Sequence, residues 1–329
     1  LTLVGQFDAA NSDDDPRDFL YDLSIGEPLR PTSFDERNQF IEHTWYSADG
    51  LFDATVRPGS YELIVSRGME YDIHRESIIL NAGAFDERQV SITHSVEPRG
   101  YVSIDTHLHA VNSPDSAMTL EDRVISIAGE GVEYAASTDH NAITQYQPAV
   151  GRTGLTDWLV TSVGIEVTTF EMGHFNGFPL RHDSSSVRGG DIEWAGFDPG
   201  EIFDQIRSRG SIGRQNTIVQ IAHPRWETLG YFSAYNFNQE DGEVVGQAGL
   251  RAVFSPFSEE FSLDRFSWDF DAIEIISGKR QDLVHNYRVP SPLPPPPLPP
   301  PEEIPDTGEI LRKSNGDIAW PGALDDWFA

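Results

Sequence analysis

Two histidines separated by one residue, His107 and His109, are the residues whose type and spacing point most clearly to a chemical role. They end a segment that reads as a β-strand, and residues i and i+2 of a strand point to the same face. Two imidazoles on one wall can bind a single metal ion. The spacing therefore predicts a metal-ligand pair.

Three further polar signals each follow an apolar, strand-like segment. Asp139 and His140 follow one segment, Glu166 follows the next with His174 eight residues later, and His223 follows a third. A lone histidine is more often a packed or surface residue, but the joint placement favours a metal site. The sequence has no cysteine, so nitrogen and oxygen ligands remain, and these suit zinc, iron or manganese.

The elements that position these residues alternate between strand and helix from residue 99 onward. Helices are expected after Thr119, where residues 119–122 resemble a capping box, and from Asp198-Pro199-Gly200. Such alternation favours parallel strands closed into a barrel, where the carboxyl ends of the strands meet at one mouth. The expected strands are 101–104, 132–137, 159–163, 218–222 and 272–276.

Residues 1–98 show a different pattern, which predicts a small all-β sandwich. The segments 52–56 and 61–65 alternate apolar and polar residues around a turn at 57–60, and further strands are expected at 71–80 and 90–96. The turn and the residues after it resemble transthyretin-like or carboxypeptidase-regulatory-like modules. We expect two domains, 1–98 and 99–329.

The motifs at 105–109, 137–141, Glu166, His174 and 222–224 together resemble those of the polymerase and histidinol phosphatase (PHP) superfamily. The upstream β module and the Asp-His-Asn form of the second motif are most similar to CehA/McbA-type metallohydrolases. The resemblance implies an α/β fold, a distorted (β/α)7 TIM-like barrel.

The resemblance also implies metal ligands. His107 and His109 would bind one metal, Glu166 would bridge two metals, and His174 and His223 would hold the second. The implied function is a hydrolase with a di- or trinuclear site, in which a water shared by divalent ions loses its proton at neutral pH. The bond attacked would be a phosphoester, or an ester, amide or carbamate.

Four residues have other implied roles. His140 would bind a third metal, contact the small-molecule substrate or serve as an acid. Asp105 would orient a ligand histidine without binding the metal itself, and Asp139 would do the same, bind the metal or cap its turn. Arg225 would bind an anionic substrate group or form a surface salt bridge.

One expected PHP element is missing from the sequence, the late Asp-x-His motif. Residues 271–278 resemble the strand before that motif, and 324–329 resemble the helix leading into it. We expect the barrel to lack its last strand in this chain, to be completed by a continuation segment or partner chain. The competing interpretation is a reduced site that binds metal without efficient turnover.

A non-catalytic role in an extracytoplasmic assembly is the alternative to an enzyme. It would use the β module and the polyproline insertion at 290–301 for contacts, although that insertion reads more simply as an exposed spacer. Calcium binding by residues 13–15 is a weaker hypothesis, because the run lacks the spacing of a calcium loop.

The charge balance argues against some classes of binding partner. There are 53 acidic and 23 basic residues among 329, a formal net charge of -30, which argues against nucleic acid or an anionic membrane. The excess fits a salt-adapted or extracytoplasmic surface. No apolar run is long enough to span a membrane. The sequence begins at Leu1 rather than methionine, so we expect a periplasmic or secreted protein whose leader has been removed, or a fragment.

Overall fold

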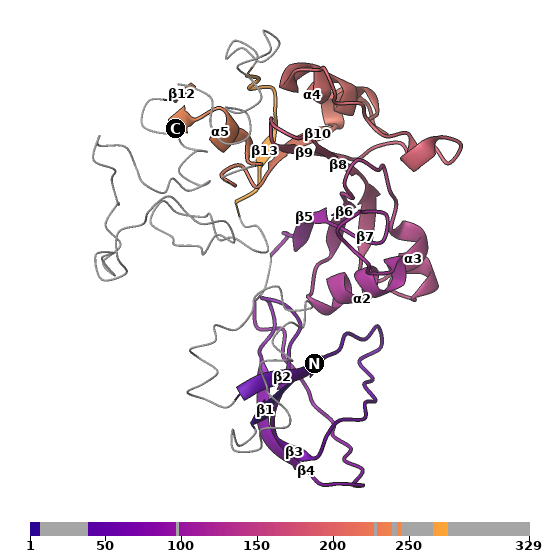
Figure 1. Cartoon of the computed structure of the whole chain (residues 1–329). Coiled ribbons are helices and arrows are strands. Elements are labelled where there is room, and N and C mark those ends of the chain that lie inside the picture. The colour runs from indigo at the N-terminus through magenta and orange to yellow at the C-terminus, as the bar shows by residue number, and fades with distance from the viewer. Residues whose placement is uncertain (7–38, 97–98, 227–228, 239–241, 245–265, 276–329) are drawn as a thin grey trace, which may run out of the picture. The chain divides into compact units, whose positions relative to one another are not determined.

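The computed structural model describes residues 1–6, 39–96, 99–226, 229–238, 242–244 and 266–275 (Figure 1). The expectations for residues 13–15, 290–301 and 324–329 lie outside this part. The chain is a mixed α/β structure with two compact units. Each unit combines three separate segments of the chain, and the domain boundary expected between residues 98 and 99 stays a prediction. The first unit is Leu1–Asp105, Met118–Ala135 and Tyr146–Thr161, and the second is Thr106–Ala117, Ala136–Gln145 and Ser162–Ala329.

The amino-terminal sheet has four antiparallel strands in the order β2-β1-β3-β4. A small apolar core that includes Tyr61 and Leu63 is packed on it. The predicted hairpin between 52–56 and 61–65 is wrong, because β3 pairs with β1 and β4 instead. The described residues give one layer, and the second layer of a sandwich stays a prediction. The strands are β1 (Thr2–Gln6), β2 (Gln39–Thr44), β3 (Gly59–Val65) and β4 (His74–Leu80).

A second sheet has three strands in the order β5-β6-β7. In the chain, α2 lies between β5 and β6, and α3 lies between β6 and β7. Helix α2 begins where its capping residue predicted, since the Thr119 side chain accepts a hydrogen bond from the backbone N–H of Asp122. The elements are β5 (Ile104–Leu108), α2 (Leu120–Gly129), β6 (Tyr134–Ser137), α3 (Gln147–Arg152) and β7 (Val160–Val163).

The third sheet positions the candidate site and has the order β13-β10-β9-β8. β10 runs parallel to β13, but β8–β9 and β9–β10 are antiparallel. The expectation of parallel pairing throughout is therefore wrong here, because a short link without a helix joins β8 to β9. The described strands do not close into a barrel. The strands are β8 (Ile165–Thr168), β9 (His174–Phe178), β10 (Ile218–Ala222) and β13 (Ala272–Ile273).

The two faces of this sheet differ in chemistry. Along β9, Phe175 joins the main apolar cluster, while His174 and Asn176 point to the opposite face. Helix α4 (Pro199–Ser208) covers the apolar face with Phe203 and its neighbours. It begins after Asp198, as expected, and the structure adds a capping box there. The other face is buried but polar, and it carries the candidate site.

Gly164 lies between β7 and β8, where the chain passes from the three-stranded sheet into the four-stranded one. A Cβ atom here would lie 2.8 Å from the carbonyl oxygen of Ser137 and 2.9 Å from that of Gly177. Only glycine allows this approach of three backbone segments. The approach brings the end of β6 next to the start of β8.

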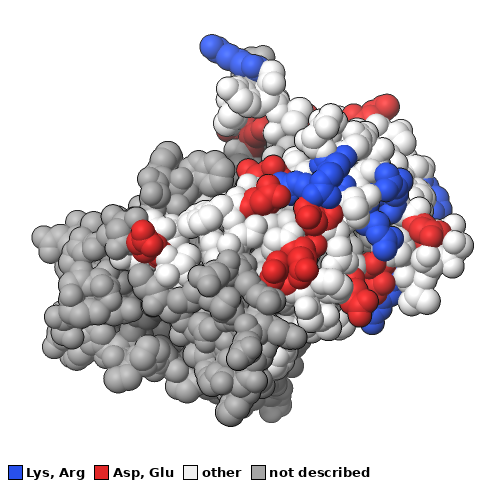
Figure 2. Space-filling view, turned by 90° about the horizontal axis from the view of Figure 1, so that it is seen from above, with Lys and Arg blue, Asp and Glu red and all other residues white. Residues whose placement is uncertain are grey.

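The remaining short elements follow β9 in the chain, and α5 and β12 are labelled in Figure 1. No helix in the described ranges is long and apolar enough to cross a membrane. On the face shown in Figure 2, basic side chains lie beside acidic ones. The short elements are the 3-10 turns Val187–Gly189 and Arg214–Asn216, helix α5 (Tyr231–Ala234), and the paired strands β11 (Phe237–Asn238) and β12 (Glu243–Val244).

Candidate metal centre

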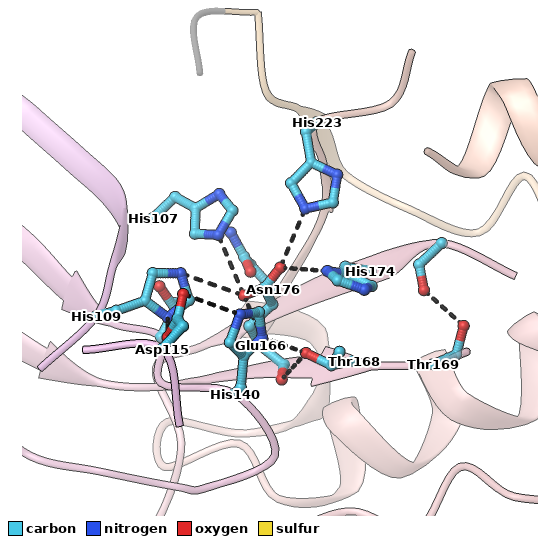
Figure 3. Close-up of polar contacts among 12 residues, drawn as sticks. His107, His109, Asp115, His140, Glu166, Thr168, Thr169, His174, Asn176 and His223 are labelled. Atoms are coloured by element: carbon cyan, nitrogen blue, oxygen red, sulfur yellow. Dashed lines mark hydrogen bonds and ion pairs between the residues drawn. The ribbon is translucent and has the colours of Figure 1, made fainter. Parts of the chain in front are cut away.

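The carboxylate of Glu166 lies at the centre of a cluster of imidazoles (Figure 3). Its side chain is fully buried on the polar face of β8. A buried carboxylate is costly unless it is paired, and here both of its oxygens have nitrogen neighbours. The surrounding side chains are His107, His109, His140, His174 and His223.

Three of the imidazoles face Oε2 of Glu166. The Nε2 atom of His107 lies 3.2 Å away, Nε2 of His109 lies 3.3 Å away, and Nδ1 of His140 lies 2.8 Å away. His107 lies on β5, His109 directly follows β5, and His140 follows β6. These three side chains lie at or just after the ends of two neighbouring strands of one sheet. They contact a carboxylate on β8, which belongs to a different sheet.

The other two imidazoles face Oε1 of the same carboxylate. Nδ1 of His174 lies 2.8 Å from this oxygen, and Nε2 of His223 lies 3.3 Å from it. His174 opens β9 and His223 follows β10, and these antiparallel strands are neighbours in the sheet. The two oxygens of Glu166 thus face two different sets of histidines.

Hydrogen bonds on the outer side fix how the rings turn. Nδ1 of His109 lies 3.1 Å from the hydroxyl of Ser113, and Nδ1 of His107 lies 3.0 Å from Oε2 of Glu274. Both Nε2 atoms therefore face Glu166. Nδ1 of His140 also lies 2.5 Å from the hydroxyl of Thr168.

The electrostatics of the cluster are dominated by Glu166. Burial raises the pKa of its carboxyl, but the charge on His107 and the hydrogen bonds from the imidazoles outweigh this and hold it well below its usual value. Burial lowers the pKa of His107, yet the adjacent carboxylates raise it well above its usual value. Burial lowers the pKa of His109 to about 4. The cluster thus combines a charged imidazole with a neutral one around an ionised carboxylate.

These side chains fit a divalent metal ion. Three groups of potential ligands have their donor atoms within 4.8 Å of one another: His107 with His109 and Glu166, His140 with Glu166 and His174, and His109 with Asp115 and His140. Imidazole and carboxylate donors are suited to such ions, and divalent charge would offset the buried carboxylate and leave the imidazoles neutral. Nδ1 of His223 and Nε2 of His174 are buried and have no hydrogen-bond partner in the described residues.

Asp139 lies beside the cluster, with each carboxylate oxygen bound to a protein donor. Oδ1 accepts from the backbone N–H of Ala110 at 2.6 Å, and Oδ2 accepts from the hydroxyl of Thr144 at 2.6 Å. The side chain is fully buried. These contacts hold the backbone next to His109, and the roles expected for Asp139 stay predictions.

Two other predicted residues are not among the groups of potential ligands. Asp105 lies on β5, partly buried, in the first compact unit. The Arg225 guanidinium donates to the carbonyl oxygen of Phe237 and lies over the rings of Phe232 and Phe237. Their predicted roles, orienting a ligand and binding an anionic group, stay predictions.

Sequence reasoning missed Asp115 and Glu274. Asp115 is half exposed, with Oδ2 3.5 Å from Nε2 of His140 and Oδ1 3.9 Å from Nδ1 of His109. The sequence feature that could have pointed to Asp115 is its place in the loop that follows the histidine pair. Glu274 follows β13 and lies between two isoleucines in the sequence. Because neighbouring side chains of extended chain point to opposite faces, this position predicts that Glu274 points away from the apolar face.

Comparison with known proteins adds little to this geometry. No family model and no curated protein matches the sequence. Among solved structures, the chain is similar to a two-domain protein from Bacteroides vulgatus that contains a predicted PHP-like metal-dependent phosphoesterase. The identity is 18% and the TM-score 0.28, over 38% of this chain and 36% of that one. The case for a metal centre rests on the side chains themselves.

Proposed function

We propose that this protein is a metal-dependent hydrolase with a di- or trinuclear centre built around Glu166. The observation that carries the proposal is the division of the histidines between the two oxygens of this carboxylate. A carboxylate placed in this way can bridge two cations, each completed by its own imidazoles. Bound divalent ions would supply an activated water at neutral pH and stabilise negative charge on the attacked centre.

Different side chains of the cluster would have different roles. His107 and His109 would hold one ion, His174 and His223 another, with Glu166 between them. His140 would take a third ion together with His109 and the half-exposed Asp115, or pass a proton to the leaving group. We propose zinc, iron or manganese, and a phosphoester, ester, amide or carbamate bond as the target.

The first test is metal content combined with hydrolysis. The purified protein would be loaded with zinc or manganese, its metal measured by elemental analysis, and its activity assayed on model phosphoesters, carboxylic esters and carbamates. We expect bound metal and turnover of one of these classes, with both lost on treatment with a chelator.

Two variants connect the activity to the cluster. His107→Ala and Glu166→Gln should reduce metal content and abolish hydrolysis, because each removes a donor from the centre. His94→Ala is the matched control, since this histidine pairs with Glu70 on the surface of the β module. Unchanged hydrolysis in both cluster variants would overturn the proposal. Metal binding without turnover would instead favour the non-catalytic alternative.

A further inference from the structure

Glu274 reaches the cluster from the carboxyl end of β13. Its backbone N–H donates to the carbonyl oxygen of Ile221 at 2.9 Å, which extends the parallel pairing of β13 with β10. The preceding Ile273 packs against the apolar cluster. Because neighbouring side chains of a strand alternate, Glu274 points to the polar face. Its side chain is 10% exposed.

One oxygen of this carboxylate has two partners in the candidate centre. Oε2 lies 3.0 Å from Nδ1 of His107 and accepts a hydrogen bond of 2.6 Å from the backbone N–H of His223. His107 faces Oε2 of Glu166, whereas His223 faces Oε1. Glu274 therefore touches one histidine from each of the two sets.

The contact with His107 determines which ring nitrogen faces inward. An ionised carboxylate can only accept hydrogen bonds, so Nδ1 of His107 must carry the proton. Nε2 then directs its lone pair toward the centre when the imidazole is neutral. A carboxylate behind a ligand histidine fixes its tautomer and orientation in this way.

The contact with His223 supports an unusual backbone conformation. His223 has a φ of 29°, in the left-handed region that residues other than glycine rarely adopt. Such a conformation persists only where the surroundings hold it. The hydrogen bond to Glu274 is one such restraint, and it sets where the His223 ring leaves the end of β10.

We propose that Glu274 is a positioning residue that holds His107 and His223 together and so couples the two halves of the metal centre. This inference rests on the proposed function. It assigns to Glu274 an orienting role like the one that the family resemblance implied for Asp105. Its removal should weaken metal binding by about 10- to 100-fold, the usual effect of losing such a carboxylate.

The test compares Glu274→Gln and Glu274→Ala with a control at the opposite end of β13, Asp271→Asn. Asp271 accepts a hydrogen bond from the backbone N–H of Val219 and pairs with Arg207, so it helps dock β13 without touching the cluster. Zinc affinity would be measured by competition with a chelator. We expect the Glu274 variants to bind zinc at least tenfold more weakly than Asp271→Asn does. Equal affinity in the wild type and both Glu274 variants would overturn the inference.

Nuclear magnetic resonance of histidine-labelled protein gives a readout that needs no metal. The Nδ1–H proton of His107 should exchange slowly in the wild type and be lost as a resolved signal in Glu274→Ala. Its assignment would come from its absence in His107→Gln. Persistence of this signal in Glu274→Ala would overturn the positioning role. A wild type that binds none of zinc, manganese and iron would overturn the proposed function instead, so the two failures are distinguishable.

Discussion

His140 and Glu166 are joined twice, through a parallel backbone bridge and through a contact of 2.8 Å between Nδ1 and Oε2. The backbone bridge ties the loop after β6 to β8, and flanking hydrogen bonds extend it: the Asn141 N–H donates to the Glu166 carbonyl, and the Glu166 N–H donates to that of Asp139. The side-chain contact is thus set by the backbone. The backbone therefore fixes where both side chains lie in the cluster.

Asp115 gives the first prediction. Asp115→Asn should hold fewer metal ions per chain than the wild type, because it removes a carboxylate that lies near His109 and His140. The ions held by Glu166 with the other histidines should remain. Metal content by elemental analysis measures this, with the exposed Asp204→Asn as control. Equal metal content in the two variants would exclude Asp115 as a ligand.

Asp139→Asn should destabilise the fold. The amide keeps one acceptor and turns an N–H₂ group toward a donor, so a buried hydrogen bond is lost at a cost of about 1–3 kcal/mol. Urea unfolding of the metal-free protein would measure the change. Thr144→Ser keeps the hydroxyl that donates to Asp139 and should unfold near the wild-type midpoint, whereas Thr144→Val should not. A stable Asp139→Asn variant would contradict this account.

The pair of Glu166 and His107 predicts a pH dependence in the metal-free protein. The raised pKa of His107 contributes stability that is full below its unfolded value of 6.5 and is lost as the pH rises through the folded value. The lowered pKa of Glu166 contributes stability that is full above its unfolded value of 4.5 and is lost as the pH falls through the folded value.

The difference in unfolding free energy between wild type and Glu166→Gln should therefore be greatest between pH 4.5 and 6.5 and should shrink at higher pH. Urea titrations of chelator-treated protein at a series of pH values would measure it. A difference that grows steadily above pH 6.5 would show that the two groups do not stabilise each other as charges.

Gly177 and Ile206 form a packing pair on the apolar face of β9. A Cβ atom at Gly177 would lie 2.4 Å from Cγ2 of Ile206 in α4, so Gly177→Ala should cost about 1–3 kcal/mol. In the background of Ile206→Ala, the same substitution should be neutral or stabilising, because the added methyl group fills the space. A double-mutant cycle by urea unfolding tests this coupling. Metal content should not change in any member of the cycle.

Local signals in the sequence predicted several elements well. The expected strand at 218–222 coincides with β10, and the capping residues Thr119 and Asp198 mark the starts of α2 and α4. Such features depend on a few neighbouring residues, so periodicity and capping chemistry are sufficient. The convergence of histidines on Glu166 was also expected, although their roles as ligands remain predictions.

Pairing between distant strands could not be read in the same way. Alternation gives the faces of a strand but not its neighbours or their direction, which is why the antiparallel order of β8, β9 and β10 was missed. Asp115 was missed because a half-exposed carboxylate in a loop has no periodic signal. Glu274 was missed because its partner His107 lies 167 residues away in the chain.

The alternation along β9 has a consequence for how the protein can evolve. His174 and Asn176 face the polar side, whereas Phe175 and Gly177 face α4. A mutational scan of this strand should show a period of two, with loss of metal at one parity and loss of stability at the other. If the polar side holds metal as proposed, substitutions there would change the donor groups, and with them the preferred cation, while the scaffold on the other side is inherited unchanged.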